Sequence, residues 1–73
     1  MANIEVKKVE EQLNQRVLFS VRVSMDAGQM EFPIGIQDQG SAAANEAAVL
    51  TATLGLAQEL AASARLRLGA GTR

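Results

Sequence analysis

Acid–base chemistry in this chain would rest on carboxylates, because histidine and cysteine are both absent. Their absence excludes disulfides, thiolate nucleophiles, imidazole bases and the usual zinc sites together. Asp26 falls in a turn sequence, Asp38 precedes a helical segment, and Glu46 lies near the start of that segment. These positions suit a turn, a helix cap and the helix dipole, and no two carboxylates are placed to share a cleft. We therefore expect a protein that is not an enzyme, with no catalytic residue, metal or cofactor.

The stretch Asp38-Gln39-Gly40-Ser41 is a candidate anion site, because it leads into a helix whose first N–H groups are free. It lacks the lysine of a phosphate-binding loop, and Gly35 and Gly40 do not form a glycine-rich fingerprint. We therefore interpret the stretch as a helix cap, with Ser41 as the N-cap residue.

Four arginines are a candidate basic patch, on one strand and near the end of the helix: Arg16, Arg22, Arg65 and Arg67. The net charge is nevertheless −1, and the only aromatic residues are Phe19 and Phe32. Nucleic-acid footprints usually carry excess positive charge, and single-strand binders add aromatic stacking platforms. Nucleic-acid binding is therefore not the function that we favour from the sequence.

Residues 16–37 predict a β-hairpin, because two segments alternate apolar and other side chains. The apolar positions are Val17, Phe19, Val21, Val23 and Met25, and then Met30, Phe32, Ile34 and Ile36. Asp26 to Gln29 supplies the turn. We expect Met25 opposite Met30 and Val23 opposite Phe32, a register that places the large apolar side chains on one face.

Residues 1–15 are compatible with either a strand and loop or a helix. Ile4 to Val9 alternates like a strand, whereas Val6, Val9, Leu13 and Val17 also fall on one helical stripe. A third strand would make a thin sheet viable, so we prefer a strand from Ile4 to Val9 and a loop from Glu10 to Gln15.

Residues 41–68 predict one long helix, which Gly69 would end as a C′ residue, leaving 69–73 as a frayed tail. The fold expected for residues 1–73 is a single α+β domain. It consists of an antiparallel hairpin or three-stranded meander, followed by one long C-terminal helix packed on the sheet.

Two apolar seams run along this helix at alternating four- and three-residue spacing. The Leu50 seam contains Ala43, Ala47, Leu50, Leu54, Ala57, Ala61, Ala64 and Leu68, and the Val49 seam contains Val49, Thr53, Leu56, Leu60, Ser63 and Arg67. We expect the hairpin to cover one seam, with a core of Phe19, Val21, Phe32, Ile34, Leu50 and Leu54. The second seam would then contact another copy through Val49, Thr53, Leu56, Leu60 and the nearby Gly55.

A chain of 73 residues without disulfides or metals has a marginal core, and oligomerisation is the usual remedy. The function that we expect is a non-enzymatic interaction module, working as a homodimer or higher homo-oligomer. The longest uncharged apolar run, Ala47 to Ala57, is too short to span a bilayer, and the N-terminus resembles no secretory signal. We therefore expect a cytoplasmic protein with no membrane partner.

The strands followed by Gln39-Gly40-Ser41-Ala42-Ala43-Ala44-Asn45-Glu46-Ala47-Ala48 resemble the opening of ribonuclease-H-like folds, and of the small antitoxins that share this topology. The nuclease pattern requires an aspartate in its first strand, and Ile4 to Val9 contains none, so no nuclease residue is carried over. The resemblance implies an alternative function: a small antitoxin-like regulatory protein that binds nucleic acid or a partner protein as a dimer.

Overall fold

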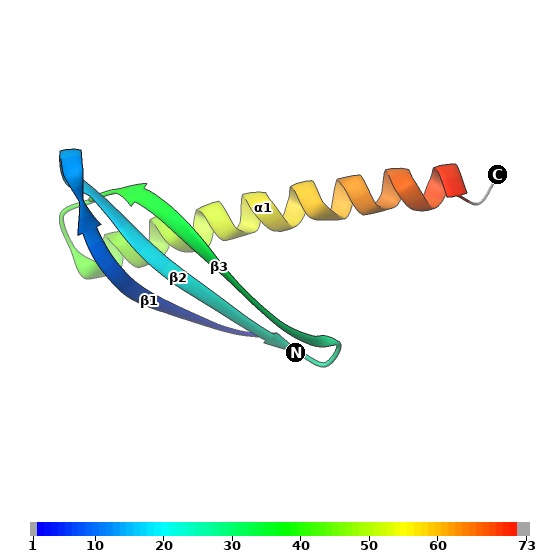
Figure 1. The fold of residues 1–73 in the computed structure, drawn as a ribbon, viewed down its shortest axis with the longest axis horizontal. Helices are drawn as coiled ribbons and strands as arrows, with labels where there is room; N and C mark the ends of the chain where they lie inside the picture. The colour runs from blue at the N-terminus through cyan, green and yellow to red at the C-terminus, as the bar shows by residue number, and fades with distance from the viewer. Residues whose placement is uncertain (1, 72–73) are drawn as a thin grey trace.

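The computed structural model describes the backbone of residues 2–71 and the side chains of residues 2–69. Three strands come first, β1 (Asn3–Gln12), β2 (Arg16–Met25) and β3 (Gly28–Gln37), with a 3₁₀ turn η1 (Leu13–Gln15) between the first two. One helix, α1 (Ala42–Gly71), follows them. The strands form an antiparallel sheet in the order β1-β2-β3, and the helix crosses one face of it (Figure 1). The predicted α+β meander with one long C-terminal helix is confirmed.

The N-terminal segment is the strand that we preferred, and the helical alternative is wrong. The strand continues to Gln12, so the predicted loop at residues 10–15 shortens to Leu13–Gln15. Its pairing with β2 shifts by one residue between Lys8 and Glu10, which leaves Val9 as a β-bulge. Asn14 lies in the left-handed region at φ 60°, a conformation that asparagine adopts more readily than most residues.

The register of the hairpin differs from our prediction by two residues. Val23 lies opposite Met30 rather than Phe32, and Val21 lies opposite Phe32. The loop holds only Asp26 and Ala27, because β3 already begins at Gly28, whose φ of +146° favours glycine. The shorter loop lets the two ten-residue strands pair along their full length. A two-residue shift leaves every side chain on the same face, so the alternation alone did not distinguish the two registers.

The core lies between the sheet and the first half of the helix. Its buried side chains are Val17, Phe19, Val21, Val23, Ile36 and Val49. Val6, Phe32, Ile34 and Ala48 pack against them and are half-buried. The predicted core positions Phe19 and Val21 are therefore confirmed, whereas Phe32 and Ile34 are only partly covered.

The prediction that Leu50 and Leu54 belong to the core is wrong, because these side chains are 39% and 59% exposed. The helix is rotated so that Val49 faces the sheet with no exposed surface and Thr53 is half-buried after it. Successive residues are about 100° apart around a helix, so turning Val49 inward turns Leu50 and Leu54 outward. The sheet therefore covers the start of the Val49 seam.

Ser41 caps the helix as predicted, with its hydroxyl oxygen accepting the Ala44 N–H at 3.1 Å. The far end differs from prediction, because α1 continues through Gly69 to Gly71. Glycine costs a helix only about 1 kcal/mol relative to alanine, so it ends a helix only where the chain also changes direction. The remainder of the predicted tail, Thr72 and Arg73, lies outside the described residues.

The helix is longer than the strands of the sheet. Its 30 residues span about 45 Å, against about 33 Å for each ten-residue strand, and it crosses the strands obliquely. In Figure 1 the C-terminal half of α1 projects beyond the sheet and away from the hairpin turn. The radius of gyration is accordingly 14.9 Å, whereas a compact domain of this length would have about 11 Å.

We predict that Val49→Ala lowers the free energy of unfolding by about 2–3 kcal/mol, because it removes two buried methyl groups and leaves a cavity beneath the sheet. Leu66→Ala is the matched control, since Leu66 is 76% exposed and belongs to neither seam. Its expected effect is below about 0.5 kcal/mol. Urea denaturation followed by circular dichroism measures both values, and equal losses would contradict this placement of the helix.

Candidate functional site

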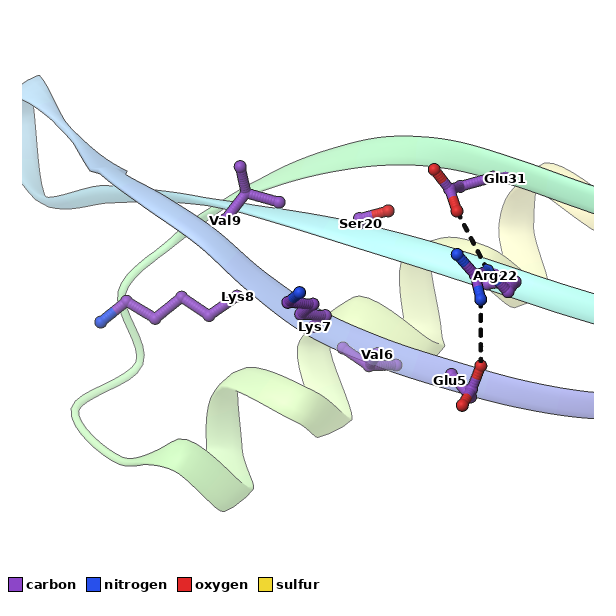
Figure 2. A pocket seen from close by; sticks show the side chains of 8 residues that line it. All are labelled: Glu5, Val6, Lys7, Lys8, Val9, Ser20, Arg22 and Glu31. Carbon is purple, nitrogen blue, oxygen red and sulfur yellow. Dashed lines mark hydrogen bonds and ion pairs between the residues drawn. The ribbon is translucent and has the colours of Figure 1, made fainter.

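The face of the sheet opposite the helix carries a row of charges across its three strands. Arg22 on β2 donates from Nε to Oε2 of Glu31 on β3 at 3.1 Å. Its Nη1 lies 4.0 Å from Oε1 of Glu5 on β1 (Figure 2). All three side chains are more than half exposed, so each ion pair contributes little to stability. The row does, however, leave the Arg22 guanidinium flanked by two carboxylates.

A shallow depression surrounds this row near the β1 edge. It is lined by Glu5, Val6, Lys7, Lys8, Val9, Ser20, Arg22 and Glu31. Figure 2 shows the Lys8 side chain extending away from the Arg22 group, and Lys8 pairs instead with Glu11 at 3.0 Å. The depression therefore contains both acids and bases. No aromatic side chain lines it, and among the described residues no buried polar side-chain atom lacks a partner. The depression has the properties of a solvated charged face.

The four arginines of the candidate basic patch fall into two separate groups. Arg16 and Arg22 alternate with the core residues of β2 and are exposed on the open face of the sheet. Arg65 and Arg67 lie near the C-terminal end of α1, on the part that projects beyond the sheet (Figure 1). Within one chain the fold does not bring the two groups together.

The segment before the helix satisfies its own polar groups. Oδ1 of Asp38 accepts the Gly40 N–H at 3.0 Å and the Asn45 side-chain amide at 3.2 Å, and Asn45 in turn accepts the Gln39 N–H at 2.7 Å. The Gly40 and Asn45 hydrogen bonds, with a smaller effect from the charge of Lys8, hold the pKa of Asp38 below its usual value. These bonds match our interpretation of the segment as a cap.

The residues predicted to form an oligomer interface divide into two sets. Val49 is buried against its own sheet, and Thr53 is half-buried, with its hydroxyl donating to the Val49 carbonyl at 2.8 Å. Leu56 and Leu60 lie further along the helix and are 37% and 51% exposed. Gly55 is also exposed, with open space where a Cβ would stand. Of the five predicted interface residues, only Leu56, Leu60 and Gly55 are therefore accessible to another molecule.

The uncovered apolar surface is larger than we expected, and most of it is on α1. Along the helix it comprises Leu50, Leu54, Leu56, Leu60, Leu66 and Leu68, at the hairpin end of the sheet Ile4, Met25 and Met30, and at the opposite end Val9 and Leu13. We had assigned Leu50 and Leu54 to the core, so the Leu50 seam was missed as an exposed surface. Its regular spacing was visible in the sequence, but the rotation of the helix was not.

In the part of the chain that the structure describes, α1 is long and apolar enough to cross a membrane, a judgement that rests on length and composition alone. The uncharged run Ala47–Ala57 is shorter than a bilayer, but the helix around it extends the apolar stretch. Most of this stretch is exposed.

Comparison of the chain with protein-family models, with curated proteins and with solved structures found no match. The function must therefore be argued from the geometry of this chain, and the feature of that geometry that most needs an explanation is the uncovered helix.

Proposed function

We propose that this chain is a non-enzymatic interaction module that associates with copies of itself, and that the projecting part of α1 supplies the interface. One observation carries the proposal. The accessible surface of the chain is 5676 Å², whereas a compact monomer of 7.7 kDa would expose about 4,300 Å². The excess of roughly 1,400 Å² is more than the ~800 Å² that each partner buries in a standard protein interface.

The character of this surface supports the same proposal. Five exposed leucines lie on the half of the helix beyond the sheet: Leu54, Leu56, Leu60, Leu66 and Leu68. An apolar face of a helix is normally covered by a neighbouring element, by another protein or by lipid. Contiguous apolar surface on this scale marks an interaction site rather than a solvated face.

Another protein is a better candidate than lipid for covering the exposed part of the helix. Val49 is enclosed by the sheet, whose other face is charged, so the first turns of α1 are unavailable to a bilayer. The remaining helix, residues 54–71, is about 27 Å long, which is less than the ~30 Å of a hydrocarbon core. It also carries Glu59, Arg65 and Arg67, and charged side chains are costly inside a bilayer.

Self-association would also compensate for the small core. Among the described residues, α1 contributes one buried side chain, Val49, to a core otherwise built by β2 and β3. A domain of this length buries a smaller share of its surface than larger domains do. Enclosing the projecting helix against another copy would add buried apolar area without any change in fold.

We expect the wild-type protein at ~100 μM to sediment at equilibrium as a dimer or higher oligomer of the 7.7 kDa chain. Dilution to ~1 μM, followed by the same measurement, should lower the average mass if association is reversible. A monomeric mass at the higher concentration would contradict the proposal.

The antitoxin-like alternative would require the arginines to act on nucleic acid, and no specific contact favours it. Arg22 is flanked by Glu31 and Glu5, which compete with phosphates for the guanidinium. We therefore predict no sub-micromolar binding of DNA or RNA at ~150 mM salt, measured by fluorescence anisotropy. Tight binding that is weakened by both Arg22→Ala and Arg65→Ala would instead support that alternative.

A further inference from the structure

Resting on the proposed self-association, we propose that two copies pair through an antiparallel packing of their α1 helices along the Leu50 seam. This seam lies largely on the side of the helix away from the sheet, because its centre is about 110° around the helix from the buried Val49 and about 150° from the half-buried Ala48. Leu50, Leu54 and Leu68 are 39%, 59% and 68% exposed along it.

The spacing of the seam is that of a helix-pairing surface. Its members recur at alternating four- and three-residue intervals from Ala43 to Leu68 without interruption. A mean spacing of about 3.5 residues sustained over more than three heptads is the pattern that keeps two helices in continuous contact. The alanines in the seam let the two backbones approach closely, near the ~8 Å end of the usual range.

The seam is complementary to itself in the antiparallel direction. Its positions are symmetric about the point between Gly55 and Leu56, so a two-fold axis there places seam residues opposite seam residues. Leu54 then meets Ala57 of the other copy, Leu50 meets Ala61, and Leu68 meets Ala43. Every leucine faces an alanine, which is how facing layers fill space without voids. A parallel pair would instead place each leucine against its own copy and each alanine against its own copy.

Charge and overall shape agree with the antiparallel arrangement. Glu46 stands near the N-terminal end of α1, and Arg65 and Arg67 stand near the other end. Antiparallel pairing brings the acidic end of one helix beside the basic end of the other and opposes the two helix dipoles, whereas parallel pairing sets arginines beside arginines. Because each sheet covers the side of its own helix that is away from the seam, we expect the two sheets to form the outer layers of the dimer.

A matched pair of substitutions tests the surface. Leu54 and Leu56 are two residues apart and about 200° apart around the helix, and both are exposed. We expect Leu54→Glu to be monomeric in sedimentation equilibrium at ~100 μM, because two like charges would be desolvated at the axis. Leu56→Glu should retain the oligomer, and circular dichroism checks that both variants are folded. Dissociation by Leu56→Glu alone would overturn the inference and place the partner on the sheet side of the helix.

Single cysteines test the direction, because the chain has no cysteine of its own. Ala47 and Ala64 are exposed members of the seam that face each other only in the antiparallel pair. Oxidising a mixture of Ala47→Cys and Ala64→Cys should yield the mixed disulfide, with neither variant forming one alone. In that arrangement each position lies about 25 Å from its own copy, beyond the ~7 Å limit between bridged Cα atoms.

Homodisulfides within each variant alone would indicate parallel pairing and overturn the inference. An oligomer that forms no disulfide in any mixture would place the interface elsewhere, and the proposed self-association would still stand. A wild-type protein that is monomeric would remove both the inference and the proposed function, so the two failures are distinguishable.

Discussion

Ten-residue strands cannot cover a thirty-residue helix, and the rest of the structure depends on this mismatch. The sheet encloses Val49 and partly covers Thr53, and beyond them the described residues of the helix are exposed, apart from the half-buried Ala61. An apolar helix left in water loses the stabilisation that burial would supply, at roughly 25 cal/mol for each Å². The same sequence that makes the helix continuous, with little to end it before Gly71, therefore creates the exposed apolar surface on which the proposed association rests.

The two faces of the molecule differ in character: the open face of the sheet is charged, and the exposed side of the helix is apolar. On the open face of the sheet, Arg22 and its carboxylate neighbours keep a solvated surface of balanced charge, and Lys8 pairs with Glu11 at the edge. Charges and the Val9 bulge on β1 also discourage edge-to-edge pairing with another sheet. The proposed association would then use the helix, where the Leu50 seam is free of charge along its whole length. A module built in this way would present two polar sheets outward from a central helix pair.

Sequence patterns predicted the elements because each has its own period, but they did not predict how the elements dock. Alternation from Val17 to Ile36 identified two strands, and Ser41 identified the start of the helix. The hairpin register was wrong because a two-residue slip preserves every face, and only the length of the Asp26–Ala27 loop decides it. The helix rotation was wrong for a related reason. Residues such as Val49 and Leu50 are both apolar and lie on adjacent faces, so the pattern offers no single face to bury. The predicted interface residues depend on the same rotation, since they were assigned by eliminating the seam that the sheet was expected to cover.

The dependence of thermal stability on protein concentration tests the central claim most directly, because it asks whether the folded chain relies on a second copy. If association encloses the helix, folding and association are linked, and the midpoint of unfolding must rise with concentration. We predict a rise of several degrees in Tm between ~1 and ~300 μM, followed by circular dichroism at 222 nm, the helix band. A Tm that is the same across this range would contradict the account, because the projecting helix would then be stable without a partner.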